Sequence, residues 1–449
     1  HLILIFHLCC LFRMLISHQF VPDDFGVGTV VPLVKDKCGN LNDVNNYRGI
    51  TLIPIISKLF ESVLLPHCQQ SLQCDDLQFG FRRGSGCQLA ALTLKATIDY
   101  FTSRGSTVYA AALDVSKAFD TVNHVELMNS LRAAGVSKWL VNIVSNWYGK
   151  LFACVRWNGC LSQPFKVKSG VRQGSIIAPS FFNVFINKLI IKLKLSSIGC
   201  HVNKCYIGCI LYADDIILLF ASISGLQRML DISAVTISEL CLKFNCAKSF
   251  CICFGVHFAK DFSPMLLGYE QLNWCKSVKY LGVTLESGRK LKINVDVVKR
   301  KFYSACNVIL CNCVYQSELL RLQLVESYCL PVLLYCMPVW NLTQSQLRAL
   351  NACWNMVYRK IFNFHKWESV RLFIFGLGRL DFEHQFLFLR LKLFKSALAS
   401  DNSVVRSVMQ CYALCEPVIS LCHTCDVNLD LSFYKLKRCI FSKFECTCW

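Results

Sequence analysis

The chain of 449 residues has few acidic side chains and lacks a hydrophobic run that would span a membrane. It contains 29 acidic against 48 basic residues, which gives a formal net charge of +19 at pH 7. The apolar opening LILIFHLCCLF stops at Arg13, well short of the roughly 20 residues of a transmembrane helix. Later apolar stretches contain acids such as Glu326 or a proline such as Pro331. We therefore expect no membrane partner, and the excess positive charge favours a polyanion such as nucleic acid.

Internal repeats and low-complexity stretches are absent, and the 29 cysteines form no even, regularly spaced disulfide framework. We interpret most of them as free, buried thiols in a reducing compartment, which indicates an intracellular protein of the cytoplasm or the nucleus. Cys422 and Cys425 form one C-x-x-C pair, followed by Cys439, Cys446 and Cys448. A zinc site in this tail stays open, although no histidine follows the pair at zinc-knuckle spacing.

Two adjacent carboxylates interrupt an apolar, strand-like run. Asp214 and Asp215 lie within YIGCILYADDIILLFA, which predicts a strand, a tight turn and a second strand with both acids at the tip. Acids between apolar strands repel each other and are desolvated at a cost unless cations bind them, and Mg²⁺ prefers such oxygen ligands. Taken alone, this pair is better explained by an exposed acidic turn.

A third carboxylate ends another apolar strand. The sequence AALDVSKAFDTVNH places Asp114 at the carboxyl end of a strand, before a turn and a helix that Gly135 closes. Acids from a strand end and from a neighbouring hairpin can hold two metal ions roughly 3.5–4 Å apart, which suits in-line nucleotidyl transfer. Between the acids, SGVRQGSIIAPSFFNVFINKLII predicts a glycine-flanked turn and an amphipathic helix. Arg172 and Gln173 in that turn offer donors to a base pair or a phosphate.

Five motifs follow one another in an order typical of one family. They are DVSKAFD, GVRQGSIIAP, YADD, FNCAKS and KYLGV, preceded by VVPLVKDKCGNLNDVNNYRGITLIPIISKLFE and QFGFRRGSGC. Together they resemble the reverse transcriptases of non-LTR (LINE-type) retrotransposons, from about Pro22 to at least Gly288 and more loosely to near Asp381. The resemblance implies an α+β fold with right-hand polymerase architecture, in which fingers, a palm with an antiparallel sheet and a helical thumb surround the site.

The chain divides by pattern along this architecture. We expect fingers and fingers/palm, truncated at the N-terminus (residues 1–110), a palm with the catalytic motifs (111–286), a helical thumb-like region (287–400) and an irregular, cysteine-rich C-terminal tail (401–449). Within the palm, Asn158-Gly159 between two strand-like runs signals a hairpin. The strands give out after Gly288, and apolar residues at helical spacing from Val295 to Ile309 predict the first thumb helix.

The resemblance also implies roles for residues at matching motif positions. The expected metal ligands and catalytic acids are Asp114, Asp214 and Asp215. The residues expected to bind the incoming dNTP are Lys35, Arg48, Phe119, Gln173 and Lys248. Those expected to contact template or primer are Arg172, Gly174, Tyr280, Leu281 and Gly282.

Phe119 matches the aromatic residue that the family uses as a steric gate. An aromatic face under the sugar leaves no room for a 2′-hydroxyl, so deoxynucleotides are selected, whereas a viral RNA polymerase would tend to have Asp there. Two positions depart from the common family pattern. Ser175 stands where an acidic residue is frequent, and Ala178 stands where a serine commonly precedes Pro179.

We therefore expect an RNA-directed DNA polymerase that transfers nucleotides from dNTPs to a primer 3′-OH. Its partners would be an RNA template and a DNA primer, with no obligate protein partner, and its cofactor would be two Mg²⁺ per site, which Mn²⁺ could replace. Because the chain starts at His1 and shows no endonuclease or ribonuclease H segment, we expect a 5′-truncated copy whose opening is a buried helix cut partway through. Two alternatives remain: an inactive, truncated remnant that only binds nucleic acid, and a group II intron maturase.

Overall fold

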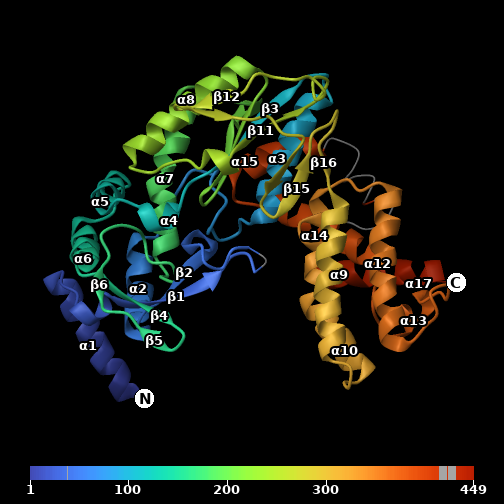
Figure 1. The fold of residues 1–449 in the computed structure, drawn as a ribbon, viewed down its shortest axis with the longest axis horizontal. Helices are drawn as coiled ribbons and strands as arrows, with labels where there is room; N and C mark the ends of the chain where they lie inside the picture. The colour runs from blue at the N-terminus through green and yellow to red at the C-terminus, as the bar shows by residue number, and fades with distance from the viewer. Residues whose placement is uncertain (38, 414–421, 423–430, 449) are drawn as a thin grey trace.

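The computed structural model describes residues 1–37, 39–413, 422 and 431–448. The chain forms an arch whose two arms are joined by a central sheet (Figure 1). N-terminal helices and strands make one arm, helices from the second half of the chain make the other, and the two chain ends lie on opposite arms. Helices and antiparallel sheets are thus combined in one architecture, and the expected α+β class is confirmed.

A four-stranded antiparallel sheet, called the palm sheet below, lies at the centre of the arch in the strand order β11-β3-β10-β9. Its strands are β3 (Val108–Asp114), β9 (Cys209–Tyr212), β10 (Asp215–Phe220) and β11 (Phe250–Phe254). The inner strand β3 carries Ala110, Ala111 and Ala112, all of them buried. Because these side chains are small, the helices on the sheet can approach its backbone closely.

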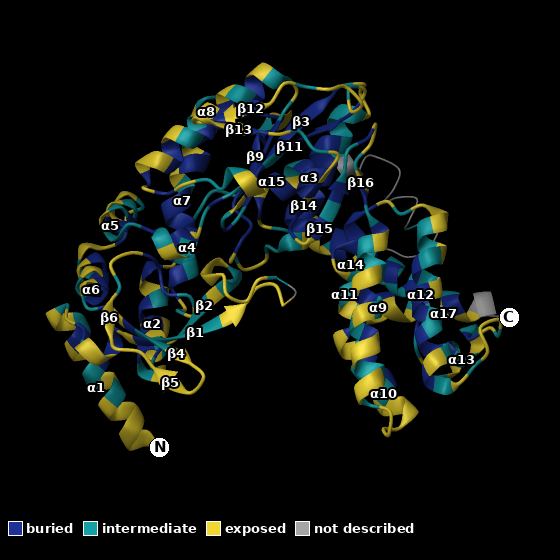
Figure 2. Cartoon of the chain, in the orientation of Figure 1, coloured by how far each residue is buried: buried dark blue, intermediate teal, exposed yellow. Residues whose placement is uncertain are grey.

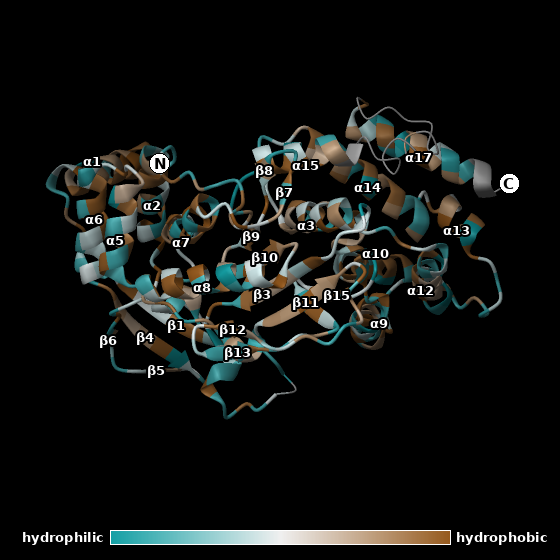
Figure 3. Cartoon of the chain, turned by 90° about the horizontal axis from the view of Figure 1, so that it is seen from above, coloured by the Kyte–Doolittle hydropathy of each residue, from teal (hydrophilic) through white to brown (hydrophobic). Residues whose placement is uncertain are grey.

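Helices α3 (Cys87–Thr102) and α8 (Ile223–Glu239) pack against the palm sheet, and α7 (Ala178–Leu195) packs against α8. The centre of the arch is accordingly buried in Figure 2, and β3 and β11 are mostly hydrophobic in Figure 3. Shorter elements complete this region: α4 (Ala118–Thr121), β7 (His201–Val202), β8 (Cys205–Tyr206), η3 (Cys246–Lys248), β12 (Met265–Leu267), β13 (Glu270–Leu272), β14 (Ser277–Tyr280) and β15 (Val283–Glu286).

A second sheet forms the N-terminal arm in the order β2-β1-β4-β5, with β6 also paired to β4. The elements of this arm are η1 (Asp23–Phe25), β1 (Val27–Val34), η2 (Val44–Asn46), β2 (Tyr47–Leu52), α2 (Ile55–Cys68), α5 (His124–Ala133), α6 (Lys138–Gly149), β4 (Phe152–Trp157), β5 (Cys160–Leu161) and β6 (Phe165–Lys166). The predicted hairpin at Asn158-Gly159 is present, with φ of 46° and 82°. However, β4 pairs in parallel with β1, so residues 152–166 lie with the N-terminal strands and not in the palm where the sequence pattern assigned them.

Helix α1 (Leu2–His18) differs from the buried helix that the apolar opening predicted. Of its residues, all of which the structure describes, Phe12 and Leu15 are buried, while Leu2 and Ile3 are 85% and 76% exposed. The first turns of the helix extend beyond the arm that its later turns contact, as the exposed residues at this end in Figure 2 show. The hydrophobic composition therefore correctly predicted a helix, but the prediction that the helix is buried was wrong for its first turns.

The other arm is helical, as the sequence predicted. It consists of α9 (Val295–Asn312), α10 (Glu318–Tyr328), α11 (Leu330–Leu334), η4 (Met337–Val339), α12 (Gln344–Phe362) and α13 (Arg371–Gly376). Helix α9 begins where the apolar spacing placed it and buries Val295, Phe302 and Cys306. One short strand, β16 (Lys292–Ile293), precedes α9 and pairs with β15, so strands do not end at Gly288 as expected.

Among the described residues, one stretch, Glu318–Val339, is long and apolar enough to cross a membrane by length and composition alone. Glu326 and Pro331 do not exclude this stretch by length and composition, contrary to the expectation from the sequence. In the structure this stretch is divided into α10, α11 and η4, and half of it is buried against the rest of the chain. Its composition therefore equally suits a helix of the protein core.

The C-terminal part of the chain is helical where the structure describes it, which corrects the prediction of an irregular tail. Helices α14 (Phe382–Leu398), α15 (Ser403–Ala413) and α17 (Phe433–Cys448) form it. Helix α15 packs on α3 behind the palm sheet. At its start, Asn402 Nδ2 donates to the carbonyl oxygen of Asp76 at 2.7 Å, and the Ser403 backbone N–H donates to the Asp76 carboxylate at 2.8 Å. Residues 401–413 are thus part of the folded centre.

The cysteines whose side chains the structure describes are free thiols, and fewer than half of them are buried, in contrast to the expected majority. Within the described ranges, no group of three or more His, Cys, Asp or Glu side chains is arranged to hold a metal ion by itself. Cys425, the second cysteine of the C-x-x-C pair, lies outside the described residues, as do the side chains of Cys446 and Cys448. The zinc hypothesis therefore stays a prediction.

Candidate active site

The three acids predicted to be catalytic meet at one end of the palm sheet. Asp114 is the last residue of β3 and pairs directly with Asp215, the first residue of the antiparallel strand β10. Asp214 lies in the two-residue turn between β9 and β10, preceded by Ala213 with φ of 57°. The antiparallel register thus places carboxylates from a strand end and from a hairpin tip side by side, as the sequence predicted.

Burial and mutual repulsion make these carboxylates hard to ionise. Burial raises the pKa of Asp215 to about 6, and the neighbouring Asp214 and Asp114 carboxylates add to the rise. Burial likewise raises the pKa values of Asp114 and Asp214 above their usual range. Among the residues that the structure describes, none forms an ion pair with any of the three acids. Their negative charge is therefore uncompensated at close range.

Four exposed cations surround the acids at longer range and oppose this rise. Lys248 and Lys35 lower the pKa of Asp114, Arg48 lowers that of Asp214, and Lys279 lowers that of Asp215. They come from different parts of the fold, which are η3, the loop after β1, and the strands β2 and β14. Three were predicted from their motifs. Lys279 was missed, although it directly precedes Tyr280 in the quoted motif KYLGV.

The acid cluster has the donor chemistry for a divalent cation. Its oxygens are hard ligands, and they carry raised pKa values that a bound cation would lower again. Mg²⁺ is commonly held by one or two protein carboxylates and completed by substrate phosphates and water, so a closed three-ligand cage is not required. Asp114 and Asp215 face each other across the strand pair and Asp214 flanks them, so these are the residues that would hold such an ion.

Phe119, the predicted steric gate, lies on the short helix α4 just beyond Asp114. Its ring stacks on Phe182 of α7 with the ring centroids 4.4 Å apart, and it meets the edge of Phe81 at 6.0 Å. Its carbonyl oxygen accepts a hydrogen bond from the Val171 N–H at 2.7 Å. Phe182 thus packs against one face of the half-buried Phe119 ring and fixes its position, as a ring that supports a sugar requires.

The turn that contains Gln173 and Gly174 contacts the N-terminal arm. The Thr51 backbone N–H donates to the carbonyl oxygen of Gln173 at 3.0 Å, and Gln173 Nε2 donates to the Asp120 carboxylate at 2.8 Å. Gly174 has φ of 119°, and a β-carbon there would lie 2.5 Å from the carbonyl oxygen of Thr51. Gly174 therefore permits contact between this turn and β2, the strand that carries Arg48.

Comparison with known proteins decides the class. The family model described as reverse transcriptase (RNA-dependent DNA polymerase) matches residues 35–285, more than half of the chain. This range includes all three acids and the four surrounding cations. The chain belongs to the reverse transcriptase family.

Curated relatives place this reverse transcriptase among those of non-LTR retrotransposons, which confirms the resemblance. It is 30% identical over 207 residues to the Pol polyprotein of the type-2 retrotransposable element R2DM of Drosophila melanogaster, a match that covers 46% of this chain and 20% of that protein. It is 26% identical over 378 residues to the probable RNA-directed DNA polymerase from transposon BS of the same fly, covering 80% and 40%. The chain thus spans less than half the length of these relatives.

Among solved structures, the reverse transcriptase is similar to apo telomerase from Candida tropicalis. The TM-score is 0.48 at 12% sequence identity, over 93% of this chain and 69% of the telomerase chain. The family membership follows from the match over residues 35–285 and not from this structural similarity.

Arg172 does not face the template as predicted. The structure buries it in the N-terminal arm of the reverse transcriptase, where it lies 3.6 Å from the Glu61 carboxylate and donates to the carbonyl oxygen of Phe25 at 2.9 Å. The Trp147 ring lies 5.0 Å from its guanidinium. Because its guanidinium interacts with a buried carboxylate and a buried carbonyl, Arg172 supports the turn from behind.

Glu61 also explains one departure from the family pattern. Its carboxylate accepts hydrogen bonds from the Ser175 hydroxyl at 2.8 Å and from the Ile176 N–H at 2.6 Å. The Ser175 hydroxyl in turn accepts from the N–H of Ala178 at 3.1 Å, at the start of α7. An acidic residue at position 175 would set two carboxylates against each other, so a hydroxyl suits this position in the reverse transcriptase. No sequence signal had singled out Glu61.

The residues predicted to hold the primer form a tight turn between β14 and β15 of the reverse transcriptase. Leu281 and Gly282 have φ of 45° and 79° and connect Tyr280 with its cross-strand partner Val283. Tyr280 itself is buried, and its hydroxyl has no hydrogen-bond partner among the described residues. Burial and the nearby Asp215 raise the pKa of this hydroxyl well above its usual value. The exposed contact surface of this turn is therefore backbone and the preceding Lys279, not the Tyr280 ring.

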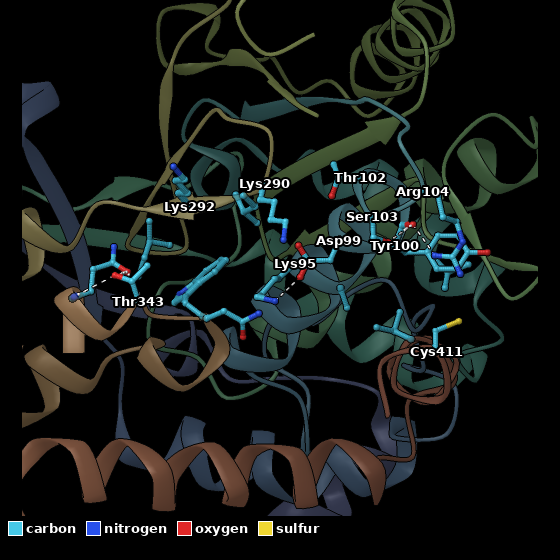
Figure 4. Close-up of a pocket in the computed structure, with 18 residues that line it drawn as sticks. Lys95, Asp99, Tyr100, Thr102, Ser103, Arg104, Lys290, Lys292, Thr343 and Cys411 are labelled. Atoms are coloured by element: carbon cyan, nitrogen blue, oxygen red, sulfur yellow. Dashed lines mark hydrogen bonds and ion pairs between the residues drawn. The ribbon is translucent and has the colours of Figure 1, made fainter. Parts of the chain in front are cut away.

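A cavity of about 500 Å³ lies elsewhere in the reverse transcriptase, between α3, the β16 loop, α12 and α15. The close-up in Figure 4 shows the ion pair of Lys95 and Asp99 on its wall, with Lys290, Lys292 and Arg104 around it. None of the residues that line it belongs to the predicted catalytic set. The acid cluster is thus separate from this cavity.

Proposed function

We propose that this chain is an RNA-directed DNA polymerase that extends a DNA primer on an RNA template. The observation that carries this proposal is the cluster of Asp114, Asp214 and Asp215 at the end of the palm sheet, raised in pKa and ringed by cations. Divalent cations bound to such a cluster, together with the surrounding basic side chains, can position phosphate groups and neutralise their negative charge, as phosphoryl transfer requires. RNA template, DNA primer and dNTPs are the partners that this reaction requires.

The acids supply the metal-binding oxygens. Two divalent ions held there, Mg²⁺ or Mn²⁺, would lower the pKa of the primer 3′-hydroxyl and stabilise the charge on the leaving pyrophosphate. Asp114 and Asp214 are proposed as direct ligands, with Asp215 acting on the ions from further out. The reaction forms one bond from the 3′-oxygen to the α-phosphorus of the dNTP and breaks the bond to pyrophosphate.

The surrounding residues bind and select the dNTP. Arg48 and Lys35 stand on the β-hairpin of the N-terminal arm and would hold the triphosphate, Arg48 through its planar fork of donors. Lys248, which comes from η3 and lowers the pKa of Asp114, would also contact the triphosphate. Phe119 would support the sugar and reject a 2′-hydroxyl, while Gln173 lies at the turn that contacts the template-paired nucleotide.

Primer extension on an oligonucleotide-primed RNA template tests the proposal. Wild-type protein with Mg²⁺ and dNTPs should extend the primer, and Asp214→Asn and Asp215→Asn should each abolish extension. Asp261→Asn, which changes an exposed carboxylate outside the cluster, is the matched control and should extend normally. Phe119→Val should permit incorporation of rNTPs that the wild type rejects.

The competing function is nucleic-acid binding without catalysis. A folded wild-type protein that binds primer–template but does not extend it with either metal ion would overturn the polymerase proposal and support a binding-only remnant. Extension that survives in the Asp214 and Asp215 variants would overturn the assignment of the acids.

A further inference from the structure

Residues 77–80 run beside the strand that leads into the catalytic turn. Gln78 forms a parallel bridge with Leu211 of β9. The Phe79 N–H donates to the carbonyl oxygen of Leu211 at 2.8 Å, and the Leu211 N–H donates to that of Leu77 at 2.9 Å. This segment therefore pairs with the free edge of β9 through a single parallel bridge and reaches the catalytic turn at Gly80.

The side chain of Gln78 hydrogen-bonds to the catalytic turn. Its Oε1 accepts from the backbone N–H of Ala213 at 2.9 Å, and its Nε2 donates to the carbonyl oxygen of Ala213 at 3.4 Å. The same Oε1 accepts from the Gly80 N–H at 2.9 Å. Gln78 is completely buried. One side-chain amide thus pairs with both backbone groups of the residue that immediately precedes Asp214.

Ala213 needs such support because of its conformation. Its φ of 57° lies in the left-handed region, which is unfavourable for an L-residue with a β-carbon. Repulsion between the flanking carboxylates also acts to open the turn. Gly80 packs against the turn so closely that a β-carbon there would lie 2.4 Å from the nitrogen of Ala213. The Asn183 side chain of α7 holds the Gly80 carbonyl oxygen from the other side at 2.8 Å.

We propose that Gln78 is a positioning residue that fixes the backbone of the catalytic turn and thereby the places of Asp214 and Asp215. This inference rests on the proposed polymerase function, because it assigns Gln78 an effect on that reaction. Gln78 touches no substrate and acts through Ala213. Misplacement of a catalytic group by about 1 Å costs on the order of 100-fold in rate, so loss of the clamp should reduce turnover at least tenfold.

The decisive variant is Gln78→Met, which keeps the length and volume of the side chain and removes its hydrogen bonds. Gln227→Met is the matched control: Gln227 clamps both backbone groups of Leu266 in β12 in the same way, at 3.0 and 2.8 Å, outside the acid cluster. Each variant is measured for kcat, for the KM of dNTP, for the Mg²⁺ concentration that gives half-maximal extension, and for the melting-temperature rise that Mg²⁺ or Mn²⁺ produces without nucleic acid.

We expect Gln78→Met to lower kcat at least tenfold and to raise the half-maximal Mg²⁺ concentration several-fold, with the KM of dNTP within twofold of wild type. Its metal-induced rise in melting temperature should shrink, whereas Gln227→Met should resemble wild type in all four measurements. If Gln78→Met does not fold, Gln78→Asn, whose amide is one methylene short of Ala213, should show the same changes in smaller degree.

Three outcomes decide between this inference and the function on which it rests. A folded Gln78 variant with normal kcat and normal metal response, beside an active wild type, overturns the positioning role alone. A wild type without polymerase activity but with a metal-induced stabilisation that Gln78→Met loses overturns the proposed polymerase and keeps the role of Gln78 at the acids. A wild type with neither activity nor metal response overturns both.

Discussion

Replacing Asp215 by asparagine should make the metal-free protein more stable while it abolishes activity. The folded state raises the pKa of Asp215 from its ordinary 3.8 to about 6, mainly through burial and then through Asp214 and Asp114. Well below pH 3.8 the carboxyl is protonated whether the chain is folded or unfolded, and its ionisation does not affect stability. As the pH rises toward 6, the unfolded chain releases a proton that the folded chain retains, so stability falls, and above pH 6 the full cost is present. Asparagine has the same shape and does not titrate.

The size of this effect follows from the same numbers. A rise in pKa from 3.8 to about 6 corresponds to about 3 kcal/mol for a fully buried group. Neighbouring groups desolvate the Asp215 carboxylate, but the residue as a whole is exposed to solvent. Water therefore reduces both the desolvation and the repulsion, and we expect about 1 kcal/mol. For a chain of 449 residues, this corresponds to about 1 °C in melting temperature by the average unfolding entropy per residue.

The assay is thermal and urea unfolding of wild type and Asp215→Asn between pH 4 and 8, with and without Mg²⁺. The variant should gain about 1 kcal/mol over wild type at pH 8 without metal, and the gain should shrink steadily as the pH falls toward 4. Saturating Mg²⁺ should stabilise the wild type more than the variant, because the ion relieves the repulsion. Asp261→Asn serves as the control for the loss of one exposed carboxylate. A variant that is less stable than wild type at pH 8, or a difference that does not change with pH, would refute the reasoning.

Three further variants test contacts around the site. Arg172→Ala should lower the free energy of unfolding by about 3–5 kcal/mol, because it leaves the buried Glu61 carboxylate without its cation. Normal urea unfolding together with weaker primer–template binding would contradict this and support the template contact that the sequence predicted. Gly174→Ala, which forces a β-carbon to 2.5 Å from a carbonyl oxygen of β2 at φ of 119°, should cost about 2 kcal/mol and reduce kcat, and an unchanged melting curve would contradict this. Asn402→Ala should cost about 1–2 kcal/mol in urea unfolding through lost bonds to the Asp76 carbonyl and at the start of α15, and a neutral result would show that this docking is weak.

Local patterns predicted the parts of the site that depend on near neighbours in the chain. The apolar runs on either side of Asp214 and Asp215 predicted two strands, and two strands joined by a two-residue turn pair with each other by necessity. The Asn158-Gly159 turn and the start of α9 were predicted for the same reason. In each case, the information lies within about ten residues of the feature.

The features that the sequence did not predict are contacts between distant segments. The sequence around Arg172 does not indicate an ion pair with Glu61 of α2, because both are charged residues within motifs of mixed composition. The parallel pairing of β4 with β1 and the docking of α15 on α3 likewise depend on packing across the fold. Gln78 belongs to a quoted motif, but the role of its amide becomes visible when the turn at Ala213 is placed beside it.

The docking of Asn402 and Ser403 on Asp76 has a consequence for how the protein matures on the ribosome. These partners are separated by 326 and 327 residues, so the segment that clamps the catalytic turn is synthesised long before its last support. At 5–20 residues per second, the interval is roughly 15–65 s. During that time residues 75–82 can fold against the palm but lack the contacts of Asp76 with Asn402 and Ser403, and the nascent chain exposes the surface of α3 that α15 will cover. We therefore expect a slower translation rate to lengthen the time for which this surface stays exposed in the nascent chain.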